Sequence, residues 1–175
     1  MELWKLAGFN WFLDFVAVFL AEYLLFGLMV GLILAFVFCP KWRKLVILMV
    51  ISVILSVILG KIAGLFFYHE QPFFVLGFTP LVGHAVDNSF PSDHSLVFFA
   101  TFWTILLYFL GSGWRVSRFW ARFLVVLTGI LAVLVGLSRI FVGVHYPIDV
   151  LASIVISGVA AVIVYFAARV LTKKA

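Results

Sequence analysis

A histidine and an aspartate stand four residues apart in the C-terminal third of the chain, at His145 and Asp149. Pro147 lies between them and suits the first turn of a helix, where no amide donor is needed. Side chains four residues apart share one face of a helix, so the carboxylate can bond one imidazole nitrogen and fix which tautomer presents the other. We therefore interpret His145 as a positioned nucleophile or base. Arg139 precedes it and offers a permanent, planar cation suited to phosphate.

A second polar cluster, Ser89-Phe-Pro-Ser-Asp-His94, opens an apolar stretch. Ser92 or Asp93 is a natural N-cap for a helix that begins there. The amides of such a first turn point outward with the positive end of the helix dipole and favour an anion. His94 stands at the same place and can donate a proton to a leaving oxygen. A simple cap at a membrane boundary is the alternative for this cluster taken alone.

Lys61 lies about two helical turns before the end of another apolar stretch, given a rise of about 1.5 Å per residue. An ammonium group at that depth needs an anionic partner or water, so it could reach toward a phosphate at the membrane surface or simply extend to water. His69, Glu70, His84 and Asp87 follow in a long connection, and we interpret them as solvated loop residues.

The elements that position these clusters must be membrane helices, because 66% of the 175 residues are hydrophobic and only 11% are charged. Soluble domains have about 45–50% and about 25%, respectively, and disorder needs the opposite bias. A spanning helix takes about 20 apolar residues. We predict an all-α integral membrane protein with one domain over residues 1–175. The five expected spans are Ala17–Cys39, Val46–Phe67, Leu96–Leu110, Phe123–Phe141 and Val150–Leu171.

The stretch Ala7–Val16 is apolar but contains Asn10 and Asp14. We interpret it as a short interfacial or re-entrant helix, which could be counted as a sixth membrane helix. It lacks the basic start of a signal peptide.

Charge is distributed unevenly between the two sides of the predicted bundle. Nine of the twelve Lys and Arg residues lie in Pro40–Lys44, Gly111–Arg122 and the C-terminal tail, whereas all seven acids and all four histidines lie toward the other side. The positive-inside rule makes the basic side cytoplasmic, which predicts a cytoplasmic C-terminus and a site on the extracytoplasmic face of a plasma membrane. The basic loops indicate topology and contact with anionic lipids rather than nucleic-acid binding.

These residues together resemble the type 2 phosphatidic acid phosphatase superfamily of membrane lipid phosphatases. Its signature reads Lys-x6-Arg-Pro, then Pro-Ser-Gly-His, then Ser-Arg-x5-His-x3-Asp. Ser138, Arg139, His145 and Asp149 match the third part in full.

Pro91, Ser92 and His94 match the second part, with Asp93 in place of Gly. The Pro-Ser-Asp-His sequence and the preceding His-Ala-x-Asp-x-Ser-Phe run are similar to bacterial undecaprenyl-diphosphate phosphatases of the bacitracin-resistance type. The Asn10-x3-Asp14 stretch is similar to that group as well.

The first part of the signature differs. Gln71 precedes Pro72 where the family has Arg, and the family Lys would fall at Gly64. Lys61 lies one helical turn earlier and could take its place in space. A neutral glutamine would lose a charge-assisted contact with phosphate, so a catalytically impaired lipid-binding relative stays an alternative.

The resemblance implies a two-step reaction without metal or cofactor. His145 would attack phosphorus to give a phosphohistidine, Asp149 would orient it, and His94 would protonate the leaving group. The implied substrate-binding residues are Arg139, Ser92, Asp93, Lys61, Gln71 and Ser138. The implied substrate is undecaprenyl diphosphate. Phosphatidylglycerophosphate, phosphatidic acid and a lipid A phosphate are alternatives, and a transporter is a further one. We expect membrane lipids but no protein partner to be required.

Overall fold

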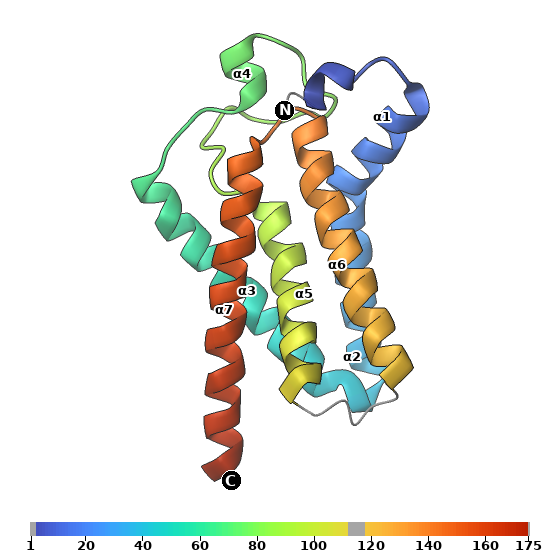
Figure 1. Cartoon of the computed structure of the whole chain (residues 1–175), viewed down its shortest axis with the longest axis vertical. Coiled ribbons are helices and arrows are strands. Elements are labelled where there is room, and N and C mark those ends of the chain that lie inside the picture. The colour runs from blue at the N-terminus through green and yellow to red at the C-terminus, as the bar shows by residue number, and fades with distance from the viewer. Residues whose placement is uncertain (1–2, 112–117, 175) are drawn as a thin grey trace.

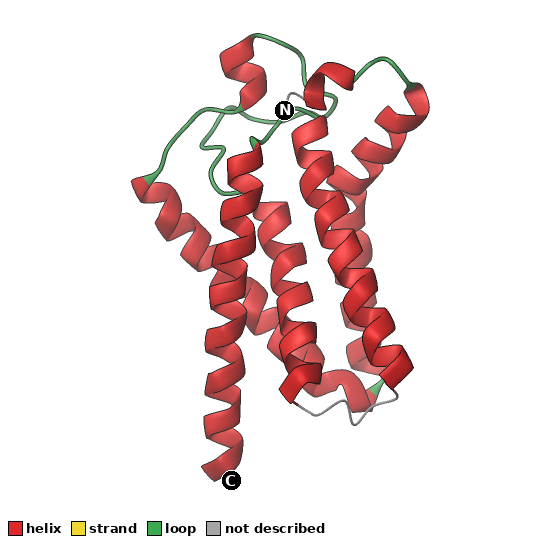
Figure 2. Ribbon diagram, in the orientation of Figure 1, coloured by secondary structure: helices red, strands yellow, loops and turns green. Residues whose placement is uncertain are grey.

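The computed structural model describes residues 3–111 and 118–174 of the chain. The part of the predicted basic connection that contains Arg115 lies outside these residues. Figure 2 shows that the regular structure in the described part is helical. An isolated antiparallel bridge joins Glu70 and Asn88 in the long connection.

Five long helical segments run between the two ends of the bundle, as the sequence predicts (Figure 1). Each has the length and apolar composition to cross a membrane, and they are Trp11–Phe38, Pro40–Phe66, Asp93–Gly111, Phe119–Phe141 and Pro147–Leu171. Their main helices are α2 (Leu24–Phe38), α3 (Arg43–Phe66), α5 (Asp93–Gly111), α6 (Arg118–Phe141) and α7 (Pro147–Lys174). The protein is therefore an all-helical, multi-pass membrane protein.

The N-terminal stretch differs from the predicted separate helix. Helix α1 (Trp11–Val18) continues through a π-helical turn, η2 (Phe19–Tyr23), into α2. The polar residues that suggested a break instead begin this helix, because Asn10 Oδ1 accepts hydrogen bonds from the amides of Phe12 and Leu13. Such a cap satisfies amides that have no partner within the helix. Residues Ala7–Val16 thus lead directly into the first span, after the short 3₁₀ helix η1 (Leu3–Leu6).

Small side chains let the spans approach closely. On α3, an added Cβ at Gly60 would lie 2.5 Å from the Leu96 side chain of α5. On α6, one at Gly136 would lie 2.7 Å from Val150 of α7. Such close contact is how helices associate in a bilayer, where burial of apolar surface gives little driving force between them.

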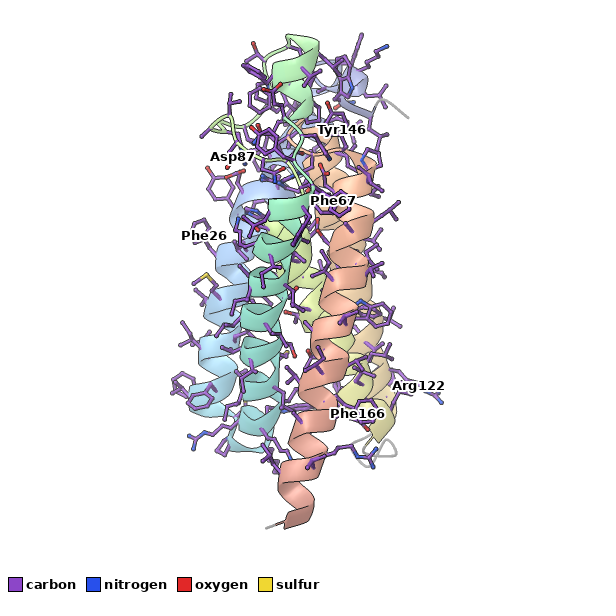
Figure 3. The ribbon with its side chains drawn as sticks, turned by 90° about the vertical axis from the view of Figure 1, so that its left-hand side faces the viewer. Phe26, Phe67, Asp87, Arg122, Tyr146 and Phe166 are labelled. Carbon is purple, nitrogen blue, oxygen red and sulfur yellow. The ribbon has the colours of Figure 1, made fainter. Side chains whose placement is uncertain are left out.

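The outward faces of the spans are apolar. Figure 3 shows Phe26 and Phe166 pointing away from the bundle, and both are exposed. Lipid tails can cover such side chains, so their exposure fits a membrane-embedded chain.

The polar clusters all come to the end of the bundle that carries α4 (Pro72–Leu76), a short helix in the long connection (Figure 1). Helices α3 and α6 end there, and α5 and α7 begin there. Figure 3 places Asp87 and Tyr146 at this end and Arg122 at the opposite one. Within the described residues, the histidines and basic residues such as Arg122 thus lie at opposite ends, as the charge distribution predicts.

Candidate active site

A cavity of about 430 Å³ opens at the α4 end of the bundle. Five of the residues predicted to form the site line it: Lys61 from α3, Asp93 and His94 from α5, Arg139 from α6, and His145 from the turn before α7. Residues 84 positions apart in sequence, from Lys61 to His145, therefore meet around one space. This convergence brings two histidines, a lysine and a buried arginine to one space, a set of side chains suited to binding an anion.

The turn between α6 and α7 fixes the position of His145. Gly143 has φ of +87°, a conformation that favours glycine, and a Cβ there would lie 2.5 Å from the Phe78 ring. The amides of Val144 and His145 both donate to the carbonyl oxygen of Arg139 at 3.3 Å. The turn therefore ties the histidine to the arginine that precedes it.

The imidazole of His145 is buried and its Nδ1 atom is held. Nδ1 lies 2.8 Å from the carbonyl oxygen of Ser89, which can only accept a hydrogen bond, so we assign the proton to Nδ1. The Asp149 carboxylate, expected as the direct partner, lies farther away, with Oδ2 at 3.6 Å from Nδ1. The lone pair on Nε2 is then available for attack.

Burial lowers the pKa of His145, and the positive charge of Arg139 lowers it further. The nearby Asp149 carboxylate opposes this shift. The net effect favours the neutral imidazole, which is the nucleophilic form.

Asp149 lies fully buried behind His145. Its Oδ2 accepts hydrogen bonds from Ser89 Oγ at 2.5 Å and from the Tyr146 amide at 2.8 Å. Its Oδ1 lies 3.0 Å from Nε2 of His69. The carboxylate is thus held through Ser89 and Tyr146 and acts on His145 at slightly longer range.

Ser89 and His69 were not predicted as site residues. Ser89 holds both His145 and Asp149, one through its carbonyl and the other through its hydroxyl. His69, interpreted from sequence as a solvated loop residue, lies against the buried carboxylate. Ser89 could have been predicted as a site residue because it lies in the same polar cluster as His94. No feature of the sequence around His69 indicates a role in the site.

Arg139 is only 1% exposed. Its Nη1 donates to Glu22 Oε1 at 2.9 Å and to the Ala21 carbonyl oxygen at 3.2 Å. Glu22 comes from the first span and was not predicted as a site residue. The signal was present, since a carboxylate within an apolar segment is costly and usually has a function.

Lys61 and Asp93 form an ion pair of 2.8 Å at the open side of the cavity. Their side chains are 68% and 52% exposed, respectively. Lys61 and Gly64, the position at which the family lysine would fall, both line the cavity. A lysine displaced by one turn can therefore still reach the same space.

Gln71 does not line the cavity. It is buried, and its Oε1 accepts the amide of Asp87 at 3.0 Å, while Nε2 donates to the Ala85 carbonyl at 3.2 Å and to the Asp87 carboxylate. The glutamine thus holds the loop that brings His84 to the cavity. The structure assigns it to that loop rather than to a direct phosphate contact.

Three other predicted residues also lie outside the cavity lining: Asp149, which lies behind His145, and the serines Ser138 and Ser92. The hydroxyl of Ser138 donates to the Val135 carbonyl within α6 at 2.7 Å. The hydroxyl of Ser92 accepts one from Ser95 at 3.0 Å. Both serines are buried, so their contacts serve the helices that carry Arg139 and His94.

No group of three or more His, Cys, Asp or Glu side chains is arranged to hold a metal ion within residues 3–111 and 118–174. Metal independence itself stays a prediction.

Comparison with known proteins agrees with this arrangement. The model of the PAP2 superfamily matches residues 41–172. Bacitracin transport permease protein BcrC of Bacillus licheniformis is 38% identical over 155 residues, which cover 87% of this chain and 70% of that protein. Undecaprenyl-diphosphatase BcrC of Bacillus subtilis is 32% identical over 153 residues, which cover 87% and 73%, respectively.

Two solved structures share the fold. The PAP2-type phosphatidylglycerolphosphate phosphatase of Bacillus subtilis superimposes with a TM-score of 0.66 at 24% identity, covering 93% of this chain and 80% of that one. LpxE of Aquifex aeolicus gives a TM-score of 0.63 at 24% identity, covering 89% and 86%, respectively.

Proposed function

This chain belongs to the PAP2 superfamily and is a membrane lipid phosphatase, and we propose that it converts undecaprenyl diphosphate and water into undecaprenyl phosphate and inorganic phosphate. The reaction would recycle the lipid that carries cell-wall precursors. The observation that carries the proposal is the convergence of His94, Arg139 and His145 on one cavity, in a chain that two BcrC proteins match over 87% of its length.

The extent of similarity favours this substrate over the alternatives. A Rhizobium etli lipid A 1-phosphatase and a Bacillus subtilis phosphatidylglycerophosphatase B match only 51% and 42% of this chain, respectively. A putative undecaprenyl-diphosphatase of Escherichia coli, YbjG, is 39% identical over 52% of it. The two BcrC proteins instead match 87% of it.

The first chemical step would be attack by His145. Its Nε2 forms a bond to the terminal phosphorus, and the bond from phosphorus to the bridging oxygen breaks. Nδ1 keeps its proton, held by the Ser89 carbonyl at 2.8 Å. The imidazole becomes positively charged in the phosphohistidine, and the Asp149 carboxylate at 3.6 Å stabilises that charge.

His94 would serve the leaving group. It lines the same cavity as His145 from the first turn of α5. In the first step it gives a proton to the lipid phosphate that leaves, and in the second it takes one from the water that attacks the phosphohistidine. One residue can act in both directions because the second step reverses the geometry of the first.

The two cations suit a substrate with two phosphates in series. A phosphoryl transition state is stabilised mainly by positioning and positive charge. Arg139 lies buried and would hold the transferred phosphoryl group, while the exposed Lys61 would contact the phosphate nearer the lipid. Asp93, paired with Lys61, would restrain the lysine until the substrate enters.

Charge supports a particular orientation in the membrane. The basic junction between α2 and α3, Arg122 and the C-terminal tail lie at the end opposite the cavity, so the positive-inside rule favours a cavity on the extracytoplasmic side of the plasma membrane. The isoprenoid tail would remain in the bilayer beside the spans.

The Bacillus licheniformis relative is named a bacitracin transport permease protein, which makes a transporter the second candidate. A transport site would be expected near the membrane midplane between broken helices. In the described spans, the charged residues instead lie toward the helix ends or, in the case of Glu22, against the site arginine. Bacitracin efflux from vesicles that survives His145→Ala would favour transport.

The direct test is release of inorganic phosphate by the purified protein in lipid vesicles. We expect kcat/KM to be higher for undecaprenyl diphosphate than for phosphatidylglycerophosphate, phosphatidic acid or lipid A 1-phosphate. EDTA should leave the rate unchanged. Faster turnover of phosphatidylglycerophosphate would overturn the substrate, and loss of activity with EDTA that a divalent ion restores would overturn the metal-free mechanism.

A further inference from the structure

Glu22 lies in the first span, before the region 41–172 that the family model matches, yet it contacts the site arginine 117 residues later in the chain. We propose that Glu22 is a positioning residue, which holds one edge of the Arg139 guanidinium so that the other edge faces the phosphoryl group. This inference rests on the proposed role of Arg139 in holding phosphate.

The contacts of Arg139 divide its guanidinium into two edges. Nη1 is occupied, with Glu22 Oε1 at 2.9 Å and the Ala21 carbonyl oxygen at 3.2 Å. Nε is buried and has no hydrogen-bond partner in the described part of the protein. A buried donor without an acceptor is costly, and a phosphate oxygen would supply that acceptor. Arginine binds phosphate through two parallel donors only when its plane is correctly oriented.

The local structure of the first span delivers both acceptors. Ala21 and Glu22 lie in the π-helical turn η2, where the amide of Leu24 donates to the carbonyl of Phe19, five residues earlier. Such turns widen a helix locally and are frequent at functional sites. Figure 1 shows α1 leaning away from α2 at this level. The Ala21 side chain is fully buried, so this part of the turn packs into the protein rather than facing lipid.

Glu22 has two opposing effects on phosphate binding. Its contact orients Arg139, which favours binding, whereas its negative charge repels an anion. The Glu22 side chain is 38% exposed, so solvent screens its charge, while Arg139 is 1% exposed and depends on its contacts for position. The contact should therefore matter more than the charge. Glutamine keeps an acceptor oxygen at this position and should retain most of the effect, whereas alanine should not.

The experiment compares E22A, E22Q and D14N in the full-length protein. Asp14 is a matched control, because it is an acid in the same helical segment whose carboxylate accepts the Gly8 amide instead of an arginine. The first readout is protection against thermal unfolding by orthovanadate, an analogue of the transferred phosphoryl group, and the second is kcat/KM. We expect E22A to lower about 10-fold both kcat/KM and the orthovanadate affinity obtained from the thermal protection. E22Q should stay within about threefold of the wild type, and D14N should not change.

A double-mutant cycle assigns the effect to Arg139. In an R139A background, E22A should cause no further loss, because the group that it positions is absent. Three outcomes would each overturn the inference. E22A could bind orthovanadate as tightly as the wild type, E22A and E22Q could lose the same amount, or E22A could cause its full loss in the R139A background. If E22A does not fold, E22D withdraws the carboxylate by one methylene, and wild-type orthovanadate affinity in E22D would overturn the inference instead.

The proposed substrate can fail separately. A wild-type protein that releases no phosphate from undecaprenyl diphosphate would refute that substrate, while orthovanadate binding would still decide the role of Glu22.

Discussion

The cavity has a floor and a mouth that hold similar charges in different ways. The floor consists of Arg139 and His145, which line the cavity, together with Asp149, which lies behind His145. All three are buried, and each has a hydrogen-bond or ion-pair partner: Glu22 for Arg139, Ser89 for His145 and Asp149. The mouth consists of Lys61 and Asp93, which are largely exposed and form an ion pair with each other. The floor is thus fixed before a substrate arrives, whereas the mouth can rearrange around it.

This difference implies a division of labour. Electrostatic interactions are stronger where water is excluded, and groups already in place need no reorganisation during reaction. An exposed ion pair contributes about 0–1 kcal/mol and is screened by salt. The floor should therefore determine the rate of the chemical steps, and the mouth should determine capture of the substrate.

The largest effect should come from His145→Ala, which removes the nucleophile from the floor. We expect phosphate release to fall at least about 1,000-fold. The intermediate gives an independent measurement, because wild-type protein quenched during turnover of terminally ³²P-labelled substrate should carry acid-labile, alkali-stable label. Label retained by the alanine variant would show that another residue receives the phosphoryl group.

Arg139→Lys should have the next largest effect. Lysine keeps the charge but lacks the planar fork, so it cannot contact Glu22 and a phosphoryl oxygen with fixed geometry. We expect kcat/KM to fall about 100-fold. Arg122→Lys is the matched control, because it changes an exposed arginine on the same helix at the opposite end. Similar losses in the two variants would mean that the floor is not specially sensitive to arginine geometry.

The sequence predicted the members of both the floor and the mouth, but not the contacts that hold the floor. Apolar length alone predicted the five spans, and the spacing of Arg139, His145 and Asp149 predicted that they would lie close together, because all three belong to one turn and the helix ends beside it. Lys61 could be placed one turn from the family position by helical geometry.

The contacts that hold the floor could not be predicted in this way. Glu22, His69 and Ser89 reach Arg139 and Asp149 from 117, 80 and 60 residues away in sequence. Such contacts depend on how the spans pack and on the path of the long connection, and no local periodicity encodes either. Gln71 is the opposite case. Its position in the sequence predicted a contact with phosphate, whereas its buried amide group instead binds the loop at Ala85 and Asp87.

The pH dependence tests the burial of the floor. Burial lowers the pKa of His145, so the neutral nucleophile should persist as the pH falls through the ordinary histidine value of about 6.5. In a plot of kcat/KM against pH, the decrease on the acid side should therefore lie below that value. Because Asp149 raises this pKa, Asp149→Asn should lower the rate and move this decrease to still lower pH with the same substrate. A decrease that moves to higher pH in this variant would contradict its assignment to His145.

By linkage, protons bind more readily to this histidine in the unfolded chain than in the folded one. Its contribution to stability should therefore fall as the pH drops below about 6.5. The melting temperature of the wild type should therefore fall as the pH drops below about 6.5, and it should fall less in His145→Gln, which lacks the titrating imidazole.

The smallest effects should come from the mouth. Lys61→Ala removes an exposed cation, so we expect KM to rise about threefold at low salt with little change in kcat. Asp93→Asn removes a negative charge that faces the incoming anion and releases Lys61, so KM should fall by a similar factor. Both effects should shrink as ionic strength rises toward about 1 M, where the screening length is about 3 Å. If Lys61→Ala instead lowers kcat as much as Arg139→Lys does, the lysine acts on the transition state and the distinction between floor and mouth fails.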